Sequence, residues 1–147
     1  MIRFYTHEVD FRLLNQRDLK SWIIQQSETA GFNCGELSYV FCSDEFLLEM
    51  NKEHLQHDYY TDIITFDYSE TAKLLHAEFY ISIDRIRDNA IENHVSFAEE
   101  LHRVMIHGVL HLLGYGDKTE SEAREMRHLE NEALKARKFH VKQYSRT

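Results

Sequence analysis

Apolar and polar positions along the chain follow two different periods, which together predict four strands and five helices. Four segments carry apolar side chains at alternating positions or in short buried runs, which is the pattern of β-strands. These predicted strands are Ile2–Thr6, Glu36–Cys42, Asp62–Asp67 and Glu78–Ile83.

Five further segments repeat apolar positions every three to four residues, which is the pattern of helices. Ser96 with Glu99, and Thr119 with Glu122, have the spacing of capping boxes, and Gly31 is a typical residue just after a helix. The predicted helices are Arg17–Ala30, a segment that Ser43 or Asp44 caps and that carries Phe46, Leu47 and Met50, a segment from Asp84 to about His94, Ser96–Leu113, and a segment from Thr119 to about Arg137.

The resulting order, βαβαββααα, predicts the arrangement of the sheet. Each early β-α-β step favours a parallel pair of strands with a right-handed crossover. The strands around Thr65 and Ile81 are joined by a loop from Tyr68 to His76 without a helix, so we expect them to pair antiparallel. The expected fold is therefore a single α+β domain over residues 1–147, with a small, mostly parallel four-stranded mixed sheet and about five helices.

Composition agrees with one globular domain. The chain has 147 residues, of which 43% are hydrophobic and 29% charged, close to the average for soluble domains. No apolar run approaches the roughly 20 residues of a membrane-spanning helix, and the acidic N-terminal segment does not resemble a signal peptide. We therefore expect a cytoplasmic protein that has no contact with membranes. Cys34 and Cys42 are too few for a disulfide framework, so we expect reduced thiols.

Charge narrows the possible partners. A formal net charge of −8 argues against coating nucleic acid by bulk electrostatics, although it allows an enzyme that contacts RNA through a local basic patch. One basic segment lies near the C-terminus. It either forms a solvated helix end or contacts phosphates, and its residues are Lys135, Arg137, Lys138, Lys142 and Arg146.

The helix predicted over Ser96–Leu113 carries the most distinctive chemistry. From Val104 to Leu113 it is apolar around nearly its whole circumference, which predicts a buried helix. The two exceptions, His107 and His111, are four residues apart and therefore stack on one face. Two such imidazoles either chelate a divalent metal or make ordinary hydrogen bonds, and a pair alone is expected by chance in a chain with 10 histidines.

The continuation of this helix favours the metal. Gly114 ends the helix, and Asp117 follows as a third possible ligand, which gives the pattern H-x-x-x-H-x-x-G-x-x-D. Three protein ligands leave one position open for water, as in catalytic zinc sites. Zinc peptidases of the H-E-x-x-H type have a general base directly after the first histidine. This chain has Gly108 there, which disfavours peptide hydrolysis by that route.

These residues resemble a known family. His107–Tyr115 reads H-G-V-L-H-L-L-G-Y, which resembles the H-G-x-L-H-L-x-G-Y signature of the YbeY family, bacterial metal-dependent endoribonucleases linked to ribosomal RNA maturation and ribosome quality control. Asn51 followed by Thr61–Phe66 resembles the family's N-x(9)-T-D/N-V-L-S-F segment. Glu78–Ser82 resembles its G-D-I-x-I-S strand. The resemblance implies a mixed sheet with a helical layer, in agreement with the predicted elements.

Three positions depart from the family pattern. Asp117 stands where the family has a third histidine, Leu55 stands where it commonly has an arginine, and Tyr60 replaces a proline. A carboxylate can replace an imidazole as a zinc ligand, so the metal site is retained. The loss of the arginine removes a basic group expected to face the phosphate.

The resemblance implies a zinc-dependent endoribonuclease that acts on single-stranded segments of ribosomal RNA. His107, His111 and Asp117 would hold one zinc ion, which lowers the pKa of a bound water and polarises the scissile phosphate. Two alternatives stay open: a zinc peptidase-like hydrolase, and a non-catalytic ribosome assembly factor with a structural metal. The candidate supporting residues are Asn51, Asp62, Glu78 and Arg103.

Overall fold

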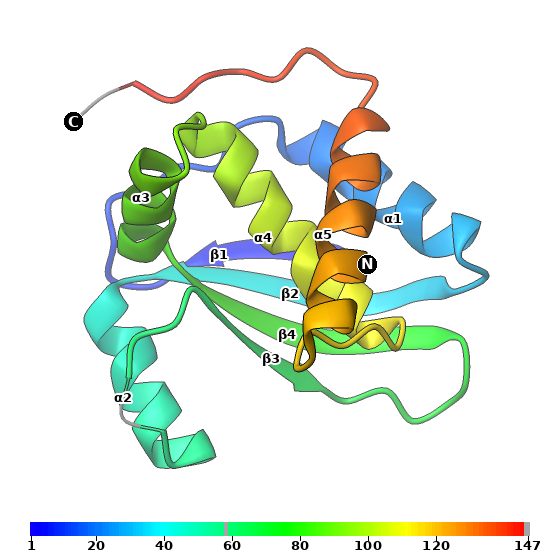
Figure 1. Ribbon diagram of the computed structural model, residues 1–147, viewed down its shortest axis with the longest axis horizontal. Coiled ribbons are helices and arrows are strands. Elements are labelled where there is room, and N and C mark those ends of the chain that lie inside the picture. Colours follow the sequence, from blue (N-terminus) through cyan, green and yellow to red (C-terminus); the bar gives the residue numbers. More distant parts are fainter. Residues whose placement is uncertain (58, 146–147) are drawn as a thin grey trace.

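Nine elements follow the predicted order in the computed structural model, which describes residues 1–57 and 59–145 (Figure 1). The strands are β1 (Ile2–Thr6), β2 (Asn33–Cys42), β3 (Ile63–Asp67) and β4 (Leu74–Ser82). The helices are α1 (Gln16–Thr29), α2 (Asp44–Leu55), α3 (Ile83–Glu92), α4 (Phe97–Leu112) and α5 (Glu120–Lys135). The predicted single α+β domain with five helices and a mixed sheet is confirmed.

The four strands lie in the order β1-β2-β4-β3. β2 pairs parallel with both β1 and β4, and β3 pairs antiparallel with β4, as expected for strands joined by a short loop. The prediction of a parallel pair from the second β-α-β step is wrong, because β4 lies between β2 and β3. Only Ile64 of β3 is fully buried, whereas alternate residues of β4 are buried, so the more apolar strand takes the central place.

The two faces of the sheet have different coverings. One face carries the large core side chains of β2 and β4, which pack with α1 and α4 and include Leu37, Tyr39, Phe41, Phe79 and Ile81. On the other face a smaller cluster of Cys42, Leu47 and Ile64 lies under α2. In Figure 1, α2 lies on the opposite side of the sheet from α4. The candidate metal ligands of α4 therefore belong to the larger core side of the molecule.

Several predicted boundaries shift by a few residues. β2 begins at Asn33 and β4 at Leu74, inside the predicted loop, because a β-bulge between Cys34 and Leu37 lets the two strands continue pairing. The cap of α3 is Ser82, whose hydroxyl accepts a hydrogen bond from the N–H of Arg85, rather than Asp84. β4 accordingly ends at Ser82 rather than Ile83, and α5 ends at Lys135 rather than Arg137.

The capping residues predicted for the last two helices have the expected contacts. The Thr119 hydroxyl accepts from the N–H of Glu122, and the Glu122 carboxylate accepts from the N–H of Thr119, which completes a capping box. The Ser96 hydroxyl accepts from the N–H of Glu99. In the described part of the chain, no helix has both the length and the apolar character needed to cross a bilayer.

Candidate metal centre

Helix α4 lies unusually close to the sheet at the position between the two histidines. A Cβ atom at residue 108 would lie 2.7 Å from two ring carbons of Phe79 and 3.0 Å from Cδ1 of Ile63. The hydroxyl of Tyr39 donates to the main-chain oxygen of Met105 at 3.1 Å and so also ties the helix to the sheet. Gly108 is therefore required by packing, and α4 holds both histidines at a fixed height above β3 and β4.

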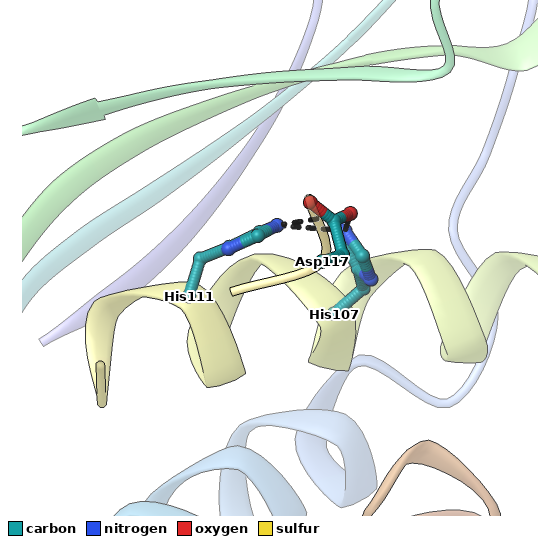
Figure 2. Close-up of side chains that lie close together, drawn as sticks. All are labelled: His107, His111 and Asp117. Atoms are coloured by element: carbon teal, nitrogen blue, oxygen red, sulfur yellow. Dashed lines mark hydrogen bonds and ion pairs between the residues drawn. The ribbon is translucent and has the colours of Figure 1, made fainter. Parts of the chain in front are cut away.

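Three side chains converge beside this contact (Figure 2). The Nε2 atoms of His107 and His111 lie 3.0 Å apart, and each lies 3.5 Å from Oδ2 of Asp117. The two histidines come from successive turns of α4, and the aspartate comes from the loop between α4 and α5. The structure thus brings together the three residues that the sequence pattern selected.

The spacing of these three atoms fits a divalent metal. With metal–ligand bonds of about 2.0–2.2 Å, the ligand atoms of a tetrahedral site lie roughly 3.3–3.6 Å apart. The observed separations of 3.0, 3.5 and 3.5 Å are close to this value. Two imidazoles and one carboxylate are also a donor set that zinc accepts in catalytic sites. The residues present therefore fit a three-coordinate protein site with further positions open.

The loop after α4 delivers Asp117 and also orients His111. Gly114 has a φ of +109°, a left-handed conformation that lets the chain turn back after the helix. The N–H of Tyr115 then bonds to the main-chain oxygen of Leu110, and the main-chain oxygen of Tyr115 accepts from Nδ1 of His111 at 2.9 Å. With Nδ1 donating, Nε2 of His111 carries the lone pair that faces the other two ligands.

Glu130 of α5 makes the corresponding contact with His107, and sequence reasoning did not single it out. Its Oε2 atom lies 2.6 Å from Nδ1 of His107, and its Oε1 atom accepts from Arg103 at 3.0 Å. Only 8% of the Glu130 side chain is exposed. The one signal in the sequence is position, because Glu130 falls on the apolar stripe of α5 with Met126 and Leu134.

The charges around His107 reinforce one another. Burial alone would lower the pKa of His107, but the hydrogen bond and charge of Glu130, with the charges of Asp62 and Asp117, raise it above its ordinary value. Burial alone would raise the pKa of Glu130, yet the hydrogen bonds from His107 and Arg103 lower it. Glu130 is therefore held as a carboxylate beside the imidazole.

A pocket of about 330 Å³ opens beside these residues. Its walls come from α4, α5, the loop between them and the residue just before β3, and they include His107 and Asp117. Burial raises the pKa of the Asp62 carboxyl in this wall. The pocket also contains two arginines that pair with Glu130: Arg103 at 3.0 Å, and Arg127 at 3.7 Å with a side chain that is 56% exposed. A substrate that entered this pocket would meet the histidine cluster and a cation.

Comparison with known proteins identifies the family. The family model described as "Endoribonuclease YbeY" matches residues 2–138. The chain belongs to the YbeY family. It is 45% identical over 138 residues to "Endoribonuclease YbeY" of Cytophaga hutchinsonii, and the match covers 94% of this chain and 96% of that protein. It is 46% identical over 133 residues to the protein of the same name from Parabacteroides distasonis, which covers 90% and 93%.

A solved structure shares the fold. The solution structure of a protein from Thermotoga maritima matches with a TM-score of 0.64 at 24% identity and covers 92% of this chain and 87% of that chain. The YbeY resemblance read from the histidine signature is thus confirmed by comparisons that extend over most of the chain.

The other candidate residues of the site fall into two groups. Asp62 and Arg103 line the pocket beside His107. Asn51 and Glu78 lie elsewhere. The Asn51 side chain is buried and donates to the main-chain oxygen of Tyr59, which fastens the loop after α2. Glu78 accepts from the Tyr68 hydroxyl and, because side chains alternate along β4, shares the α2 side of the sheet rather than the α4 side.

The basic segment at the end of α5 and beyond it has both engaged and exposed side chains. Arg137 donates to Nδ1 of the buried His102 at 2.8 Å, and Lys135 pairs with Glu132 at 3.3 Å. Lys138 and Lys142 are exposed, and Arg146 lies outside the described residues. Leu55, at the position of the YbeY arginine, is the last residue of α2 and is 42% exposed.

Proposed function

We propose that this chain is a zinc-dependent endoribonuclease in which His107, His111 and Asp117 hold the metal. The observation that carries the proposal is the convergence of two imidazole nitrogens and one carboxylate oxygen at the edge of an open pocket. Membership in a family whose curated relatives are named endoribonucleases supports RNA as the substrate. The substrate we propose is single-stranded ribosomal RNA, processed in the cytoplasm during rRNA maturation and ribosome quality control, with the ribosomal subunit as a partner.

In this proposal, the side chains around the metal site have different roles toward the substrate. A bound divalent metal would supply Lewis acidity toward a phosphate oxygen and lower the pKa of water. Arg127 is the more exposed of the two arginines in the pocket wall: both pair with Oε1 of Glu130, Arg103 at 3.0 Å and Arg127 at 3.7 Å, but 56% of the Arg127 side chain is accessible compared with 13% of Arg103. We propose that Arg127 contacts a phosphate of the substrate and so replaces the basic group that is missing at Leu55. Asp62 lines the same pocket and adds negative charge beside His107.

The packing of α4 argues against the peptidase alternative. Metallopeptidases of the H-E-x-x-H type need a glutamate directly after the first histidine. At residue 108 even a Cβ atom would lie 2.7 Å from the Phe79 ring, so a longer side chain does not fit there. The alternative of an assembly factor with a structural metal is disfavoured by the ligand set, because structural zinc sites are closed by four protein ligands.

An assay of two substrates tests the proposal. Labelled single-stranded RNA and casein are offered to zinc-loaded protein and to H107A under identical conditions. We expect cleavage of the RNA alone. The cleavage rate should fall more than about 100-fold in H107A, because loss of a metal ligand reduces activity more than loss of a residue that only supports a ligand. Casein cleavage that disappears in H107A would favour the peptidase. RNA binding without cleavage would favour the assembly factor.

A further inference from the structure

Three side chains form a hydrogen-bonded chain on the side of His107 that faces away from the metal cluster. Arg103 and His107 lie on successive turns of α4, and Glu130 reaches between them from α5. The exposed fractions of the three side chains are 13%, 21% and 8%, so the contacts are largely shielded from water. Shielded contacts to charged groups are stronger and better ordered than those at the surface.

Each oxygen of the Glu130 carboxylate has its own donor. Oε1 accepts from Arg103 at 3.0 Å and also faces Nη1 of the more exposed Arg127 at 3.7 Å, and Oε2 lies 2.6 Å from Nδ1 of His107. An ionised carboxylate can only accept, so the neutral His107 ring, which is the form that binds a metal, carries its hydrogen on Nδ1. The unprotonated nitrogen is then Nε2, which is the atom that faces His111 and Asp117.

We propose that Glu130 is a positioning residue that sets the metal affinity of the site by fixing the orientation and tautomer of His107. The role of Arg103 is to hold the carboxylate in place and to balance its charge. Partners that bind the outer nitrogen of a ligating histidine characteristically orient the ring and strengthen its bond to the metal. This inference rests on the proposed function only in that the histidine cluster binds a metal.

The competing explanation is a structural brace. An Arg103–Glu130 ion pair between α4 and α5 could stabilise the helix pair without affecting the metal. The two explanations differ in what they predict for metal binding by a folded variant. The brace alone lowers stability and leaves zinc affinity unchanged, whereas the positioning role changes zinc affinity and the position of the ring hydrogen.

The variant E130Q separates them, because glutamine has one acceptor oxygen for two donors. Its amide nitrogen must face either Arg103 or His107, so one contact is lost. We expect zinc affinity, measured by chelator competition, to fall about 10- to 100-fold. The matched control is E132Q, which removes a carboxylate from the same helix but only an ion pair with Lys135 at the surface, and which should bind zinc as the wild type does.

A spectroscopic readout covers the case in which E130Q is poorly folded. Long-range ¹⁵N correlation spectra of the histidine rings report which nitrogen carries the hydrogen. At a pH high enough for the His107 ring to be neutral, metal-free wild type and E130D, which keeps the carboxylate but is one methylene shorter, should show the Nδ1–H form of His107. Zinc affinity of E130D should lie between those of the wild type and E130Q.

Wild-type zinc affinity in folded E130Q, or a His107 ring with its hydrogen on Nε2 in the wild type, would overturn the proposal. Zinc affinity is measured without RNA. A failure of RNA cleavage therefore counts against the proposed function alone.

Discussion

Asp117 is the most exposed of the three candidate ligands, with 43% of its side chain accessible compared with 21% for His107 and 34% for His111. It is also the ligand that departs from the family pattern. A carboxylate brings a negative charge that a third imidazole would not. We therefore expect a weaker Lewis acid, and a higher pKa for metal-bound water, than in a site with three histidines.

Substitution of Asp117 tests this assignment. D117A should weaken zinc binding by about tenfold or more, because one of three protein ligands is lost. D117H should retain zinc and shift the pH–rate profile for RNA cleavage toward lower pH. Zinc titration and thermal melting are measured side by side, with E120A as a control for the acidic first turn of α5. If Asp117 served only the helix dipole, D117A would lose a little stability and bind zinc normally.

His102, which precedes the candidate site on α4, is a buried histidine with a structural environment. It is 1% exposed, its ring lies 6.1 Å from that of Trp22, and its Nδ1 accepts from Arg137. Burial, together with the charge of Arg137, lowers the pKa of His102 to about 3. This imidazole therefore stays neutral in the folded protein at physiological pH.

The low pKa of His102 predicts a loss of stability in acid. The unfolded chain binds a proton near pH 6.5, whereas the folded protein binds it only near pH 3, so stability is present above 6.5 and is lost as pH falls toward 3. H102Q keeps an acceptor for Arg137 but has no such proton. Between about pH 7 and about pH 4.5 it should lose roughly 2–3 kcal/mol less than the wild type in urea unfolding. Parallel pH dependences of the two proteins would contradict this.

Among the helices, α4 has a position at which a single added carbon atom would collide with the sheet. Glycine in a helix interior normally costs stability, so alanine would be expected to stabilise an exposed site by up to about 1 kcal/mol. At residue 108 the steric conflict with Phe79 reverses this expectation. The glycine between the two histidines is thus a packing requirement of the helix–sheet contact.

G108A should consequently destabilise the protein by about 1–3 kcal/mol and weaken zinc binding, because α4 must move away from β4. The double variant G108A/F79L, in which the ring atoms are removed, should lose less than the sum of the two single variants. Urea unfolding of the four proteins gives the coupling energy. A stabilised G108A, or strict additivity, would show that the helix has room at this position.

Most elements could be predicted because their periodicities are local. The grouping of the three candidate ligands could be predicted because they lie within eleven residues, from His107 to Asp117. The direction of β3 relative to β2 could not be predicted, since it depends on which strand is apolar enough to take the central place in the sheet. Glu130 could not either. Its carboxylate resembles every other acid of α5 in the sequence, and only burial against α4 distinguishes it.

At the scale of the whole molecule, a net charge of −8 repels RNA, so binding must depend on a few placed cations. Arg127 lies in the pocket wall. The exposed lysines lie on a segment fastened elsewhere: Asn15 donates to the main-chain oxygen of His140 and accepts from the N–H of Lys142. The structure therefore favours the solvated, non-contacting interpretation of the basic segment.

Salt dependence distinguishes these cations. For binding of a single-stranded RNA to zinc-loaded protein, R127A should reduce the slope of log affinity against log salt by about 0.7, the value for one lost phosphate contact. The double variant K138A/K142A should keep the wild-type slope. A flatter slope in K138A/K142A would return the basic segment to a phosphate-contacting role, and an unchanged slope in R127A would remove that role from Arg127.

The central place of β4 also governs when the sheet can form during synthesis. β2 and β3 are not neighbours, and each pairs with β4, the last strand to be made. A nascent chain that has not yet released Leu74–Ser82 from the ribosome therefore has one open edge of β2 and no native partner for β3. Until then only β1 and β2 can pair, and such unpaired edges are the parts of a growing chain most in need of protection from aggregation.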